Sequence, residues 1–170
     1  MPCLTKQQAT YVERSATDWK HVCVAGELLA SLNRATGVGL HSLAIAQPGP
    51  PGYVCANAAG ARVALDVDAV VCKEAAEDDS LERVLHAGAL AAHLARLLAE
   101  KDGNAYQGGP YSEVVAVLVI DEPTLRLEQA VFELASVAFG PYRQLTSVYL
   151  LLPYDSSTMS RPAVPVQLRR

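Results

Sequence analysis

The sequence predicts a single α/β domain, built on a mixed sheet of about five strands with helices packed on it. Three observations predict this class. The chain has 170 residues, of which 51% are hydrophobic and 19% charged, a balance that fills one core and excludes disorder of the whole chain. Short apolar runs with strand periodicity occupy the middle of the chain. Stretches with helical spacing lie before, between and after them, so the expected order is α-α-β-β-β-α-β-α-β.

Two helices are expected before the first strand. Thr5 and Gln8 have the spacing of a capping box and predict a short helix over 5–15. A second helix begins at Thr17 and ends at Gly37, since glycine is the usual residue just after a helix.

Three strands are expected next, at 40–46, 53–57 and 62–72. Their short connections predict an antiparallel meander. In the third strand the odd-numbered residues are all apolar and predict the core face. Asp66 and Asp68 lie on the other face, about 7 Å apart along the strand.

The helix expected over 80–101 has two apolar sides. Small residues form one side and allow a sheet or another helix to approach closely. Leucines form nearly the opposite side, which must be covered either by the N-terminal helices or by a second copy of the chain. If a second copy covers it, the expected interface residues are Leu90, Leu94 and Leu97, with His86 and His93 nearby.

The remaining elements form a strand–helix–strand unit. The continuous apolar run 114–120 predicts a strand buried on both faces, a helix follows to about Phe139, and the last strand lies at 147–152. Such a unit predicts a parallel pair with a right-handed crossover. The domain is expected to end at residue 153, and 154–170 is expected to form an extended tail with arginines and a PxxP spacing. That tail is either a recognition segment for a partner domain or a frayed end.

Charge and cysteine usage exclude several classes of function. The net charge of −4 argues against nucleic acid binding, and no run of 18 apolar residues predicts a membrane span. The N-terminus has no signal-peptide pattern, so a cytoplasmic location is expected. Without a CxxC pair, zinc is not expected and free thiols are expected at all four cysteines, Cys3, Cys23, Cys55 and Cys72.

Two pairs of acids are the candidates for chemistry. Asp66 and Asp68 could hold a divalent cation together with a third ligand, or could form the solvated face of a half-exposed strand. Asp121 and Glu122 follow the most buried strand, where ligands often bind, but an acid at a helix start is also ordinary capping. No nucleotide-binding, nucleophile-elbow or zinc-protease motif occurs, so neither a cofactor nor a resident metal is expected.

One family comparison follows from these elements. The order helix, three strands, helix, strand, which covers less than half of the chain, resembles the core of the PD-(D/E)xK nucleases, and 70–74 resembles that family's third strand through Lys73. The family has an acid two residues before the lysine, whereas this chain has Val71 there. Asp66 and Asp68 alternate out of phase with Lys73. The resemblance therefore implies a degenerate relative.

The sequence leads to two hypotheses of function. The first is a non-enzymatic interaction or assembly module that binds a protein partner or itself. The alternative is a small metal-dependent hydrolase, or a degenerate PD-(D/E)xK-like nuclease, that uses Asp66, Asp68 and Lys73.

Overall fold

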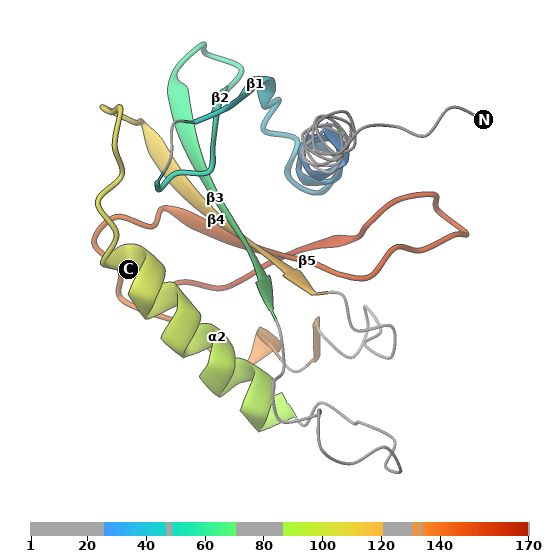
Figure 1. Ribbon diagram of the computed structural model, residues 1–170. Helices are drawn as coiled ribbons and strands as arrows, with labels where there is room; N and C mark the ends of the chain where they lie inside the picture. The colour runs from blue at the N-terminus through green and yellow to red at the C-terminus, as the bar shows by residue number, and fades with distance from the viewer. Residues whose placement is uncertain (1–25, 47–48, 71–86, 121–130, 133, 170) are drawn as a thin grey trace, which may run out of the picture.

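The computed structural model of the chain describes residues 26–46, 49–70, 87–120, 131–132 and 134–169. Its centre is a six-stranded mixed sheet whose strands lie side by side in chain order, from β1 to β6. Helix α2 lies on one face of the sheet and the helical residues 26–36 lie on the other (Figure 1). The predicted class, a mixed sheet with helices packed on it, is confirmed, with a sixth strand beyond the five expected.

The first three strands form the predicted antiparallel meander. They are β1 (His41–Ile45), β2 (Tyr53–Ala56) and β3 (Arg62–Val70). The turn between β2 and β3 is organised by Asn57, whose side-chain oxygen accepts hydrogen bonds from the amides of Ala59 and Ala61 at 3.1 and 3.0 Å. Gly60 in the same turn has a φ of 77°, a backbone conformation that glycine adopts without strain.

The second half of the sheet is built by parallel crossovers. Helix α2 (Ala87–Asp102) connects β3 to β4 (Glu113–Ile120), and β4 pairs in parallel with both β3 and β5 (Ser147–Leu151). The continuous apolar run of β4 is buried toward both faces, as its composition predicts. After β5 the chain forms a hairpin and returns as β6 (Ala163–Pro165), antiparallel to β5.

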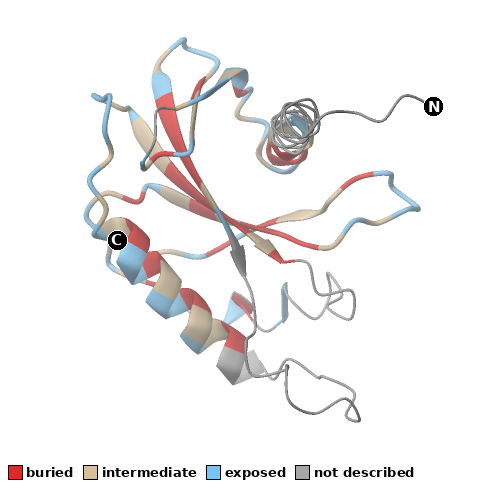
Figure 2. Ribbon diagram, in the orientation of Figure 1, coloured by how far each residue is buried: buried red, intermediate tan, exposed pale blue. Residues whose placement is uncertain are grey.

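The sheet separates two hydrophobic cores. The core on one face is formed by the helix at 26–36 with the odd-numbered side chains of β3 and β4. The core on the other face is formed by α2 with even-numbered side chains of β4 and β5. Figure 2 shows the buried side of α2 turned toward the sheet and its exposed side turned away. Gly37 follows the first of these helices with a φ of 65° and donates its amide to the Asn33 carbonyl at 2.8 Å, which confirms the predicted helix end.

The two sides of α2 are arranged differently from the prediction. Leu90 and Leu94 are fully buried against the sheet, and Leu98 continues the row, whereas the alanines of the small-residue side are exposed. The sheet thus covers Leu90 and Leu94, and neither the N-terminal helix nor a second copy is needed to bury them. Leu97, the third leucine of the expected interface, is half-buried. The physical reason is that a leucine buries far more apolar area than an alanine, at about 0.8 kcal/mol per CH₂ group. Leu90 and Leu94 therefore have no surface to offer to another chain.

The C-terminal segment is also more ordered than an extended tail. Val164 and Val166 alternate into the core beside α2, and the Val166 amide donates to the Val148 carbonyl at 2.9 Å. The prediction of a PxxP segment free to bind a partner domain is wrong, because this segment pairs with β5 of its own chain. Valines two residues apart bury one strand face, which outweighs the breaking effect of the prolines at an edge. Within the described part of the chain, no helix has the length and hydropathy needed to cross a bilayer.

Candidate functional site

The two aspartates of β3 lie on the face of the sheet that α2 covers. As the strand alternation predicts, Asp66 and Asp68 point to the same side. Their exposure differs: the side chain of Asp66 is 10% exposed and that of Asp68 is 54% exposed. The register places Ala116 of β4 beside Asp66, and this small side chain leaves room above the sheet for a longer neighbour.

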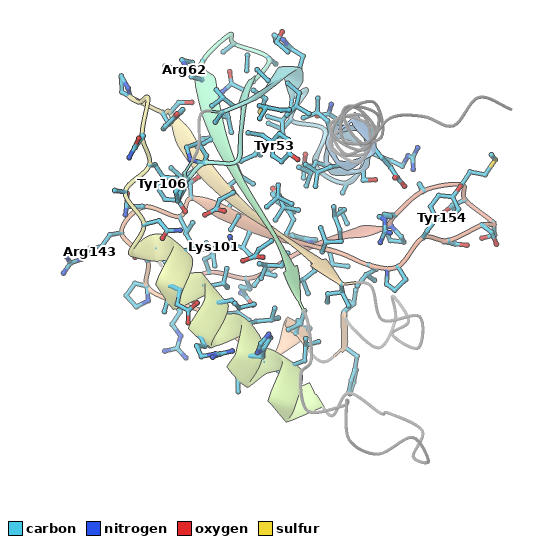
Figure 3. All side chains as sticks on the ribbon, viewed as in Figure 1. Tyr53, Arg62, Lys101, Tyr106, Arg143 and Tyr154 are labelled. Carbon is cyan, nitrogen blue, oxygen red and sulfur yellow. The ribbon has the colours of Figure 1, made fainter. Side chains whose placement is uncertain are left out.

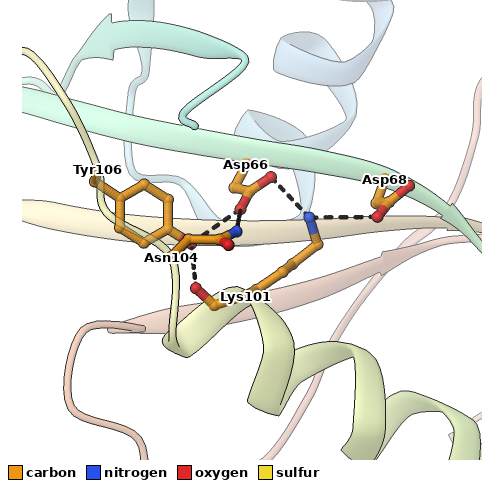
Figure 4. Close-up of polar contacts among 5 residues, drawn as sticks. All are labelled: Asp66, Asp68, Lys101, Asn104 and Tyr106. Carbon is orange, nitrogen blue, oxygen red and sulfur yellow. Dashed lines mark hydrogen bonds and ion pairs between the residues drawn. The ribbon is translucent and has the colours of Figure 1, made fainter. Parts of the chain in front are cut away.

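That neighbour is Lys101, in the last turn of α2. Its ammonium nitrogen lies 2.7 Å from Oδ1 of Asp66 and 3.6 Å from Oδ2 of Asp68 (Figure 4). The Lys101 side chain is only 7% exposed. A buried ammonium requires an anionic partner, so the two carboxylates and the lysine form one ionic unit between strand and helix.

The second carboxylate oxygen of Asp66 is occupied as well. The Tyr106 hydroxyl donates to Asp66 Oδ2 at 2.9 Å, and the Asn104 amide nitrogen donates to it at 3.3 Å. The same hydroxyl lies 3.0 Å from the Lys101 carbonyl oxygen. Burial raises the pKa of Tyr106, and the charge and hydrogen bond of Asp66 raise it further, so the phenol stays protonated and acts as a donor.

The loop after α2 positions these donors. Asp102 accepts three backbone hydrogen bonds from the segment before β5: its carboxylate oxygens lie 2.9, 2.7 and 3.1 Å from the amides of Arg143, Gln144 and Leu145. Burial raises the pKa of Asp102, but these amide donors outweigh burial, so its pKa lies below the usual 3.8. The Gln144 side chain then donates to the Asn104 carbonyl at 2.8 Å. Asn104 is thus held from two sides.

These contacts decide what the aspartates can do chemically. The ammonium of Lys101 stands where a cation bound to Asp66 and Asp68 would stand. Among the described residues, no group of three or more histidine, cysteine or acidic side chains could hold a metal ion. The interpretation of this strand face as solvated is wrong for Asp66, which is buried and paired. The cluster has the composition of a structural ionic network, not of an open metal centre.

Sequence reasoning identified the two aspartates but missed Lys101, Asn104 and Tyr106. The available signal was indirect: acids on a strand face that a helix covers need a cation, and Lys101 is the cation at the end of the crossover helix that follows. Nothing in the spacing indicates Asn104 and Tyr106, because their approach depends on the conformation of a loop. Figure 3 shows Lys101 and Tyr106 at the end of α2, beside the sheet.

The other candidate residues do not join this cluster. His93 is half-buried on α2 and its Nδ1 lies 3.3 Å from an Arg96 guanidinium nitrogen. Cys55 is a buried free thiol, in agreement with the prediction for this residue, and burial together with the charge of Glu113 raises its pKa to about 11. Several of the predicted candidate residues lie outside the described ranges: Lys73, His86, Asp121, Glu122 and the cysteines Cys3, Cys23 and Cys72.

Comparison of the chain with protein-family models, with curated proteins and with solved structures finds no match.

Proposed function

We propose that this chain is a non-enzymatic assembly module that associates with protein chains, in the first place with copies of itself. The proposal is supported by a contrast between two kinds of side chain. The buried carboxylate of Asp66 is committed to Lys101 and Tyr106 inside the fold. Large apolar side chains, in contrast, are left in water, and this contrast is the observation that carries the proposal.

Four of these apolar residues come from separate parts of the molecule. Phe132 is 84% exposed and Met159 is 78% exposed, and Ile45 and Tyr154 are 59% and 51% exposed. Full burial of an exposed phenylalanine or methionine side chain supplies about 1.5–3 kcal/mol, so Phe132 and Met159 forgo most of that stabilisation. A single exposed apolar residue is ordinary. Ile45 lies on the edge strand β1, and Tyr154 and Met159 lie on the hairpin between β5 and β6, so two exposed elements of the fold carry apolar side chains that a partner could cover.

The hairpin between β5 and β6 displays two of them on an ordered support. It projects beyond the sheet, and Tyr154 lies on it (Figures 1 and 3). Asp155 holds its tip: its Oδ1 accepts hydrogen bonds from the amide and the hydroxyl of Ser157 at 2.8 and 2.7 Å. A turn fixed in this way loses little conformational entropy when it binds. The free thiol of Cys55 agrees with a reducing compartment, so we propose a cytoplasmic location.

Sedimentation equilibrium of the wild type, up to about 100 μM, tests the proposal, since specific contacts form well below that concentration. A reversible dimer or larger species is expected. A monomer throughout the range would overturn the assembly function.

A degenerate PD-(D/E)xK-like nuclease is the second candidate, because the three antiparallel strands, the helix and the parallel fourth strand have the order on which that resemblance rests. A metal-dependent hydrolase should melt at a higher temperature in Mg²⁺ or Mn²⁺, and Asp68→Asn should abolish that shift. The assembly proposal expects no such shift. Asp68→Asn should then change the free energy of unfolding by less than about 1 kcal/mol, because its side chain is half exposed.

A further inference from the structure

We infer that two copies of this chain associate through strand β1, which pairs with its own copy across a two-fold axis centred on Ala44. The inference rests on the proposed assembly function and names the partner and the surface. It follows from the position, composition and backbone direction of β1.

Among the strands that the structure describes, β1 is one of the two edges of the sheet and pairs only with β2. Its residues are exposed except Leu43, which is half-buried. An edge strand presents unpaired amides and carbonyls that a further strand can bind. The opposite edge, β6, is three residues long and ends in Pro165, which has no amide to donate. The two edges therefore differ in how well they are protected.

The composition of β1 permits a copy of itself as the partner. The whole segment 38–46 has no acidic residue, lysine, arginine or proline, the residues that usually block edge pairing. The chain has a net charge of −4, so two copies repel each other in general. An uncharged strand is a place where copies meet without opposing like charges. Ile45, 59% exposed at this edge, gains an apolar neighbour by such pairing.

The ladder between β1 and β2 defines the register. The Ala46 amide donates to the Gly52 carbonyl at 3.0 Å, and Ala44 lies opposite Val54 two residues earlier. Alternate residues of an antiparallel strand direct their backbone groups to opposite sides. This alternation applies directly from Ala44 onward, so the amide and carbonyl of Ile45 point away from β2. Leu43 follows Ser42, which has a φ of 57° inside the irregularity between His41 and Ala44, and we infer that its backbone groups point to the same side as those of Ile45.

These outward groups match those of a second copy. If Ala44 lies opposite Ala44 of the second copy, Leu43 of each chain lies opposite Ile45 of the other, and both pairs can exchange amide-to-carbonyl hydrogen bonds. The side chains of Leu43 and Ile45 then meet on one face of the joined sheet. The irregularity between His41 and Ala44 limits the paired stretch on the other side, so the contact is short and the dimer is expected to be reversible.

A cross-link tests this register directly. Opposed residues at the two-fold axis form a non-hydrogen-bonded pair with Cα atoms about 4.5 Å apart, within the range that a disulfide spans. Ala44→Cys should therefore form a covalent dimer under mild oxidation. Ala99→Cys, an equally conservative change on the exposed side of α2, is the matched control. It should give no more dimer than the wild type, whose own cysteines set the background.

Association without a cross-link is the second measurement. Ile45→Lys places a charge at the exposed edge and should yield a folded monomer at concentrations where the wild type is dimeric, with unchanged circular dichroism. Ala99→Lys places the same charge on the exposed side of α2, outside the proposed contact, and should leave the dimer fraction unchanged. If the wild type associates, Ile45→Lys associates equally and Ala44→Cys stays at background, the β1 contact is wrong while the assembly function stands. A wild type that is monomeric throughout overturns both.

Discussion

Replacing Lys101 by methionine is the sharpest test of the buried ionic cluster. The change keeps the length of the side chain but removes the ammonium that lies 2.7 Å from Asp66. Asp66 then keeps only the neutral donors Tyr106 and Asn104, at 2.9 and 3.3 Å. Removing one member of a buried ion pair costs about 3–5 kcal/mol, because the remaining charge is left without a counter-charge. We expect the lower end, about 3 kcal/mol, since both neutral donors remain.

Replacing Asp66, the other member of the buried pair, should cost less free energy of unfolding than replacing Lys101. In Asp66→Asn the ammonium of Lys101 still has the half-exposed side chain of Asp68, whose Oδ2 lies 3.6 Å away. The double variant Asp66→Asn, Lys101→Met leaves no buried charge without a counter-charge, since the Asp68 side chain is 54% exposed to water, and it keeps an oxygen for Tyr106. Its free energy of unfolding should lie within about 1 kcal/mol of the wild type, because a buried pair replaced as a whole costs little.

Urea unfolding followed by circular dichroism measures all four proteins and yields the coupling energy of the pair. For a chain of this size a loss of 3 kcal/mol corresponds to a melting temperature lower by about 6–12 °C. Arg96→Met, which removes an exposed cation of the same helix, is the control and should change stability by less than about 0.5 kcal/mol. Additive single effects, or a Lys101→Met variant as stable as Arg96→Met, would refute the ionic role of Lys101.

Three further predictions concern other parts of the fold. The pKa of Asp102 is lowered in the folded state, so its contribution to stability is fully present above the unfolded pKa of about 4 and is lost as the pH falls below it. Urea titrations from pH 6 to pH 3 should show a larger loss in the free energy of unfolding for the wild type than for Asp102→Asn. Equal losses would contradict the role of the amide hydrogen bonds. The Cys55 thiol is buried and its pKa is raised to about 11. Mass spectrometry should therefore find Cys55 unlabelled by iodoacetamide at pH 8 in the native protein and labelled in urea. Rapid labelling of the native protein would show that the thiol is accessible to solvent. Met159 has a φ of 50°, which asparagine tolerates better than methionine. Met159→Asn should therefore raise the free energy of unfolding, measured in urea, by up to about 1 kcal/mol. A clear decrease would mean that Met159 contributes packing that its exposure does not indicate.

Local patterns predicted the strands well. The alternation of the third strand predicts one core face, because successive side chains of a strand point to opposite sides. The run 114–120 is apolar at every residue, so this strand has to be buried on both faces. The short connections predicted the antiparallel meander and the longer ones the parallel pairs, since parallel neighbours need a crossover. The even-numbered placement of Asp66 and Asp68 followed from the same periodicity.

Packing between elements decided what these patterns leave open. A helix with two apolar sides contains no local information about which one faces the sheet, and the larger area of the leucines decided it for Leu90 and Leu94. The C-terminal valines became a sixth strand only because β5 offered a free edge. The sequence by itself determined that two carboxylates share one strand face. Only the tertiary structure decided that a lysine 35 residues later in the chain lies against them, since an ion pair over that separation depends on where the crossover helix ends and on nothing near either residue.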